Sequence, residues 1–188
     1  RRVYIAFDSS SLGDTIAWMP YVEEFRCLHN CEVIVSTFKN FLFEKEYPML
    51  EFVEPGTTVN NLYAMYKIGW FYNDNKEPVL PNTIPLQQTA TNILGLPYKE
   101  IKPRIHNSGL KANYKLVTIA TNSTAGCKFW TRENWQEVIN YLHGQGYIVK
   151  NVSLESNPFD NCDALLDKSI ESTIEWITQS EFFIGLSS

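Results

Sequence analysis

Apolar runs and helical stripes alternate along the first half of the chain. Residues 2–7 are mostly apolar, which is typical of a strand covered on both faces. After Asp14, apolar side chains recur at helical spacing, and apolar runs at 31–37 and 50–55 flank a short helical pattern at 40–47. This β-α-β-α-β order predicts a parallel sheet with helices on both of its faces.

The pattern is less regular after the third predicted strand. An aromatic run at 62–72 is compatible with a strand, and a polar loop follows it. A helical stripe over 86–94 stops at Gly95 with a proline just beyond, the usual punctuation of a helix C-terminus. Residues 98–115 have no period, so we place a domain boundary inside them, near residue 108.

The same alternation begins again after this boundary. Three strands and two helices alternate there, and in chain order they are predicted at 115–121, 135–142, 147–154, 170–177 and 181–186. The sequence therefore predicts the α/β class, with two Rossmann-like units at 1–108 and 109–188. We expect the second unit to be incomplete and its last strand to have an uncovered apolar face.

A ligand of such a protein is expected in the cleft between the two units, at the carboxyl ends of the strands. The loops that reach this position are 8–14, 121–131 and 153–162. The first of them lacks both the G-x-G-x-x-G and the P-loop pattern, so neither the dinucleotide nor the P-loop mechanism is supported.

Asp14 stands at the start of the first predicted helix and has two interpretations. Aspartate is a favoured N-cap, and its charge suits that end of the helix dipole. Alternatively, Asp14 faces the cleft and accepts a proton from an incoming hydroxyl, with Gly13 letting the backbone approach. Ser9, Ser10 and Ser11 would then bind a polar substrate, or they simply satisfy the turn.

The loop at 121–131 offers groups suited to an anion. Ser123, Thr124, the backbone around Gly126 and Lys128 follow a strand and precede a helix, so N–H groups and one point charge could hold a diphosphate. The plainer interpretation is an ordinary loop with a solvated lysine. Glu155 follows the next strand, where an acid can bind ribose hydroxyls, although a solvated turn residue is the simpler assignment. A base from one unit and a diphosphate cradle from the other would suit a metal-independent sugar-nucleotide transferase.

The composition excludes several function classes. The net charge of −5 argues against non-specific binding to nucleic acid or to an anionic membrane. No apolar stretch approaches the roughly 20 residues that cross a bilayer, so we expect a cytoplasmic protein. Its four cysteines lack zinc or redox spacing and are expected to be reduced thiols. Because the chain starts without Met and ends on an apolar strand, we expect both ends to be cut.

Several segments in order resemble one family over nearly the whole chain. They are "DSSSLGDTIAW", "IVSTFKNFLFEKEYP", "LYAMYKIGWFY", "LGLPYKEIKPRI", "NSTAGCKFW" and "FFIGLSS". These segments resemble the bacterial autotransporter heptosyltransferases, which belong with the lipopolysaccharide heptosyltransferases. That family has two Rossmann-like domains in the GT-B arrangement. It transfers heptose from ADP-glycero-manno-heptose to serine hydroxyls of an autotransporter adhesin.

The resemblance implies roles for particular residues. Asp14 would be the general base, with Ser10, Ser11 and Gly13 in the loop on the acceptor side. Lys128 would stabilise the departing ADP in place of a metal, in a single inverting displacement. The resemblance assigns donor binding to Ser123, Thr124, Lys128, Glu155, Ser187 and Ser188. It further implies ADP-heptose and an adhesin polypeptide as partners, and a homo-oligomer for the full-length protein.

The chain also departs from the family pattern. The family continues after the position of Ser188 with a glycine-led helix that completes the donor site, so the resemblance implies a C-terminally truncated protein. In that missing part the family carries four cysteines that bind iron, and the cysteines of this chain, Cys27, Cys31, Cys127 and Cys162, are not those residues. We therefore expect no metal site and no cofactor here.

The alternative to an enzyme is an inactive remnant that acts as a protein-binding module. Its surface would include the aromatic cluster Trp70, Phe71 and Tyr72. Core packing is the favoured interpretation of that cluster.

Overall fold

The computed structural model describes residues 1–72, 79–107, 109, 113–123, 125–152, 159–165 and 169–186. Contacts divide the chain into two compact units, Arg1–His106 and Asn107–Ser188. The boundary predicted near residue 108 falls two positions beyond this division, and residue 108 itself lies outside the described residues.

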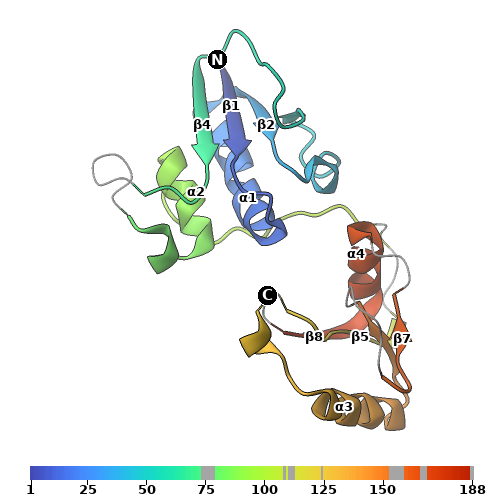
Figure 1. Cartoon of the computed structure of the whole chain (residues 1–188). Helices are drawn as coiled ribbons and strands as arrows, with labels where there is room; N and C mark the ends of the chain where they lie inside the picture. The colour runs from blue at the N-terminus through green and yellow to red at the C-terminus, as the bar shows by residue number, and fades with distance from the viewer. Residues whose placement is uncertain are drawn as a thin grey trace. The chain divides into compact units, whose positions relative to one another are not determined.

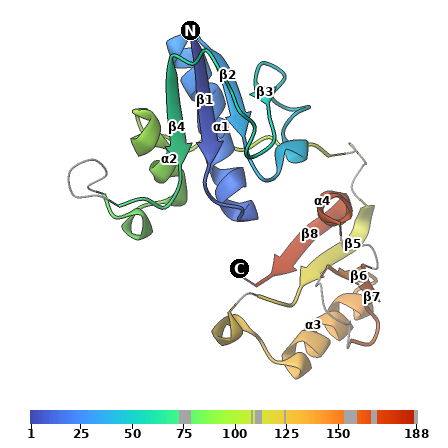
Figure 2. The same ribbon diagram turned by 45° about the horizontal axis from the view of Figure 1, so that its top comes forward.

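Unit 1 is built on a four-stranded parallel sheet in the order β3-β2-β1-β4 (Figures 1 and 2). The central strand β1 is buried along most of its length, as its continuous apolar run predicts. The bounds of the strands are β1 Arg2–Phe7, β2 Glu32–Ser36, β3 Glu51–Phe52 and β4 Ala64–Ile68.

Two helices, α1 (Leu12–His29) and α2 (Leu86–Leu94), pack against each other in unit 1. Trp18 is fully buried on α1, and its indole N–H donates to the carbonyl of Leu86 at 3.0 Å. The C-terminus of α1 is closed by Asn30 in the left-handed conformation (φ 44°), which asparagine tolerates better than most residues.

The region between β2 and β3 differs from the sequence prediction. The helix expected over 40–47 is reduced to a 3-10 turn at Asn40–Leu42, followed by further turns, and the strand expected over 50–55 is only the two-residue β3. The apolar spacing reflects burial of Leu42 and Phe43 in this turn rather than a helix.

Asn40 holds this turn together from a buried position. Its Oδ1 accepts hydrogen bonds from the backbone N–H and the hydroxyl of Thr37, both at 2.9 Å, and its Nδ2 donates to the carbonyl of Val53 at 2.9 Å. The side chain therefore joins the exit of β2 to the residue that follows β3.

Unit 2 repeats the parallel arrangement with the strand order β7-β6-β5-β8, again with its first strand inside the sheet. Figures 1 and 2 show α3 and α4 on opposite faces of this sheet. The elements are β5 Asn113–Ala120, a 3-10 turn Gly126–Lys128, α3 Arg132–Gly144, β6 Ile148–Asn151, β7 Asp163–Ala164, α4 Ile170–Gln179 and β8 Ser180–Gly185.

The core of unit 2 lies between its sheet and α3, where Val117, Ile119, Trp135, Ile139, Leu142 and Val149 are buried. On β8, by contrast, Phe182 and Phe183 are 38% and 45% exposed. Because successive side chains of a strand point to opposite faces, these two aromatic residues do not form one uncovered face, and the apolar face expected on the last strand stays a prediction. Among the described helices of both units, none is long and apolar enough to cross a membrane.

We expect Asn40→Ala to lower the free energy of unfolding by about 2 kcal/mol, because it leaves buried backbone groups at Thr37 and Val53 without a partner. Asn60→Ala at an exposed position is the control and should change stability by less than about 0.5 kcal/mol. Urea denaturation of both variants tests this, and equal effects would contradict the role assigned to Asn40.

Candidate active site

Asp14 lies in the first turn of α1, but it is not the N-cap. The helix begins at Leu12 with Ser11 in the cap position, and no side chain makes a capping hydrogen bond there. The carboxylate of Asp14 is only 7% exposed, and its Oδ2 accepts a hydrogen bond from the indole N–H of Trp70 at 2.8 Å. Asp14 is therefore not the N-cap, and its side chain is directed to a partner 56 residues away, although its charge does lie in the first turn, where it suits the helix dipole.

The serine-rich turn before α1 combines a structural role with exposed hydroxyl groups. Ser9 Oγ accepts from the backbone N–H of Ser11 at 3.1 Å, so Ser9 satisfies the turn. Ser10, Ser11 and Gly13 are exposed beside it. A Cβ at Gly13 would meet Ser11 Oγ at 3.9 Å, an ordinary contact, so local packing does not require glycine there.

The segment after β4 is fastened to the segment after β1. The backbone N–H of Asp8 donates to the carbonyl of Ile68 at 2.8 Å, and the carboxylate of Asp8 pairs with Lys67. The Lys67 ammonium also lies 5.7 Å from the centre of the Phe71 ring. Through these contacts, the exits of β1 and β4 form one surface that carries Asp14.

From the sequence, Trp70 was a candidate only for the surface of a protein-binding module, and its contact with Asp14 was missed. Its side chain is 50% exposed, and Tyr72 is also exposed, so the core-packing interpretation of this cluster is wrong for both. The segments that carry Asp14 and Trp70 meet because β1 and β4 are neighbouring strands, and this adjacency was the signal that could have identified Trp70. The aromatic run gave no sign of that pairing.

In unit 2, the loop after β5 leads into the 3-10 turn Gly126–Lys128 instead of directly into α3. Lys128 is exposed on this turn, and the backbone N–H of Ala125 lies 3.5 Å from Ser123 Oγ. The other donor-site residues predicted from the sequence, which are Thr124, Glu155, Ser187 and Ser188, lie outside the described residues.

Asp14 belongs to unit 1 and Lys128 to unit 2, and each unit is described by itself. Their meeting across a shared cleft therefore stays a prediction. Within unit 1, Asp14 stands at the carboxyl edge of a parallel sheet, which is where ligands of such sheets bind. Its buried carboxylate, hydrogen-bonded on one side, has the geometry of a proton acceptor.

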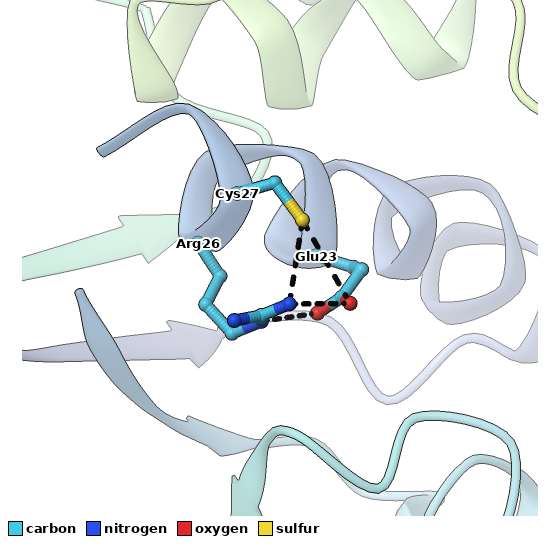
Figure 3. Close-up of polar contacts among 3 residues, drawn as sticks. All are labelled: Glu23, Arg26 and Cys27. Carbon is cyan, nitrogen blue, oxygen red and sulfur yellow. Dashed lines mark hydrogen bonds and ion pairs between the residues drawn. The ribbon is translucent and has the colours of Figure 1, made fainter. Parts of the chain in front are cut away.

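A second polar cluster lies near the other end of α1, roughly 20 Å along the helix axis from Asp14. Figure 3 shows the Arg26 guanidinium, the Glu23 carboxylate and the Cys27 sulfur in mutual contact. Arg26 donates to the Glu23 carboxylate at 2.8 Å and 3.0 Å and lies 3.3 Å from the Cys27 sulfur. The Glu23 carboxylate raises the pKa of the Arg26 guanidinium above its ordinary value. This cluster stabilises the end of the helix and takes no part in the candidate site.

In the described part of the chain, no disulfide joins any two of the cysteines Cys27, Cys31, Cys127 and Cys162. Within the described part of the chain, no three His, Cys, Asp or Glu side chains gather in a way that could hold a metal ion.

Comparison with known proteins identifies relatives over the whole chain, although no protein-family model matches. The autotransporter heptosyltransferase Aah of Escherichia coli is 31% identical over 205 residues, which span 100% of this chain and 52% of Aah. The autotransporter heptosyltransferase TibC of Escherichia coli O78:H11 is 29% identical over 100% of the chain and 50% of its own length. This chain is a homologue of the autotransporter heptosyltransferases. It spans about half the length of these relatives.

Solved structures agree with this relationship. TibC in complex with ADP-D-beta-D-heptose matches with a TM-score of 0.85 and 28% identity, over 100% of this chain and 54% of TibC. The Escherichia coli heptosyltransferase WaaC with ADP matches with a TM-score of 0.54 and 12% identity, over 100% of this chain and 82% of WaaC, which supports the fold alone. The predicted fold class, two Rossmann-like units of the GT-B type, is confirmed.

The expectation of no cofactor is contradicted by the same comparison. TibC is an iron-containing, dodecameric glycosyltransferase. The side chains described here do not fit an iron ion, since they form no cluster of ligands. We therefore derive no step of the chemistry through iron.

We expect iodoacetamide at neutral pH to alkylate Cys27 faster than Cys31. Cys27 is exposed, whereas burial raises the pKa of the Cys31 thiol against the opposing effects of the N-terminal ammonium and Arg26. A raised pKa leaves less of the reactive thiolate, so the difference should narrow as the pH rises. Peptide mass spectrometry over time measures both rates, and preferential labelling of Cys31 would contradict this assignment.

Proposed function

We propose that the protein containing this chain transfers heptose from ADP-glycero-manno-heptose to serine hydroxyls of an autotransporter adhesin. The observation that carries the proposal is the buried, oriented carboxylate of Asp14 beside an exposed serine-rich turn, in a chain homologous to heptosyltransferases. The donor is chosen because TibC has been solved with ADP-heptose.

The proposed chemistry is a single displacement at the anomeric carbon. The acceptor serine oxygen attacks from the side opposite the diphosphate and forms the new glycosidic bond as the bond to ADP breaks. Asp14 takes the proton of the serine hydroxyl, and Lys128 offsets the negative charge that develops on the departing ADP. Attack from the opposite side inverts the anomeric configuration. The charge at the diphosphate is thus assigned to a side chain, and no step requires a metal.

The two units divide this work. Unit 1 presents Asp14 to the acceptor, with Ser10, Ser11 and Gly13 at the entrance, and unit 2 binds the donor. Lys128 and Ser123 lie on the exposed loop after β5 and suit a diphosphate. TibC is dodecameric, which supports a homo-oligomer here. The cytoplasmic location and the remaining donor contacts stay predictions.

A protein-binding module without activity is the second candidate. The exposure of Trp70 and Tyr72 favours it, because exposed aromatic side chains are common at protein interfaces. The two candidates differ in what Asp14 does, and replacing that residue separates them.

We expect Asp14→Asn to keep the fold, since an asparagine oxygen still accepts the Trp70 hydrogen bond, and to lower the transfer rate by about 10²-fold or more. The measurement is the mass increase of an adhesin substrate incubated with ADP-heptose and the gene product that contains this chain. Asp163→Asn, at an exposed position on β7, is the matched control and should transfer at the original rate. An unchanged rate for Asp14→Asn would remove the base from the mechanism.

Lys128→Ala should impair use of the donor and leave binding of the acceptor largely unaffected. We expect kcat/KM for ADP-heptose to fall about 10-fold or more while acceptor binding is retained, because the lysine meets the diphosphate and offsets the charge that develops on it. Lys102→Ala, another exposed lysine, serves as the control. Steady-state kinetics with each substrate varied in turn would refute the assignment if kcat/KM for the donor did not change.

A further inference from the structure

Trp70 forms a hydrogen bond that has an unusual combination of features. The tryptophan is half exposed, whereas the carboxylate it contacts is buried in the first turn of α1. An indole N–H can only donate, so the bond requires Asp14 Oδ2 to be an acceptor. Because half of its surface is exposed, the Trp70 side chain gains only part of the free energy that burial of an indole can give. What this position does give the side chain is the hydrogen bond to Asp14.

The bond also distinguishes the two oxygens of the carboxylate. The terminal torsion of an aspartate is broad, so an unattached carboxylate samples many orientations. Fixing Oδ2 at 2.8 Å from Trp70 Nε1 fixes the direction of Oδ1 as well. We propose that Trp70 is a positioning residue, which holds Oδ2 so that Oδ1 takes the proton of the acceptor hydroxyl. This inference rests on the proposed function, in which Asp14 is the base.

The position of Trp70 depends on the backbone of Gly69, the residue that precedes it. A Cβ on Gly69 would lie 2.8 Å from Asp8 Cβ and 2.8 Å from the Phe71 ring, closer than real contacts allow. Gly69 thus lets the segment after β4 approach the segment after β1. The ion pair of Asp8 with Lys67, the second-last residue of β4, holds the same two segments together. The position of the backbone at Gly69 therefore places the indole next to Asp14.

The test removes the N–H of Trp70 in two variants, of which the second also keeps the shape of the two-ring side chain. One variant is Trp70→Phe, and the other replaces Trp70 with β-(3-benzothienyl)alanine, in which sulfur stands for the indole N–H. We expect both to lower kcat by about 10-fold, because a displaced base reacts less often, and to leave the KM for ADP-heptose unchanged. Tyr63→Phe, an exposed aromatic just before β4 at the opposite edge of the sheet, is the control and should keep the original kcat.

A spectroscopic readout separates this proposal from the proposed function. In protein labelled with ¹⁵N at the indole nitrogens, the Trp70 resonance is identified by its loss in Trp70→Phe. We expect the chemical shift of this resonance to change in Asp14→Ala, where the hydrogen bond is lost. In Asp14→Asn the indole N–H should remain hydrogen-bonded. A benzothienylalanine variant with the original kcat, beside an inactive Asp14→Asn, would overturn the positioning role alone. An active Asp14→Asn would overturn the proposed base, and the positioning role with it.

Discussion

The parallel pairing of β1 with β4 is the constraint on which the candidate site depends. The two strands are joined in register from Val3 with Ala64 to Phe7 with Ile68, although more than 50 residues separate them in the chain. Because parallel neighbours end at the same edge of a sheet, the segments that follow them must meet. Asp14 and Trp70 come together as a consequence of this pairing, and local sequence contributes only the residue types.

Much of the fold could be predicted because buried apolar residues recur along the sequence at the period of the helix or strand that they belong to. The continuous apolar runs of β1 and β5 and the stripe around Trp135 on α3 each matched the element that formed. The same reasoning failed between β2 and β3. There, Leu42 and Phe43 are buried by a turn held by the side chain of Asn40, and apolar spacing alone does not distinguish such a turn from a helix.

The candidate site was predictable in part. Asp14 was identified from its place after a buried strand and at the start of a helix, but that place alone left both a cap and a base open, and the structure has Ser11 in the cap position. Trp70 could not be identified, since a hydrogen bond between residues 56 positions apart leaves no periodic signal. The exposed indole was therefore assigned to the core on composition, which is the usual place of a tryptophan.

The last strand of unit 2, β8, combines an edge position with exposed aromatic side chains. This strand is at the edge of its sheet, paired with β5 on one side, and carries the exposed side chains of Phe182 and Phe183. An edge strand with aromatic side chains and unpaired backbone groups is a template for strands of other chains. The outer side of β8 is therefore the position at which a further strand, from the same protein or from another chain, would extend the sheet of unit 2.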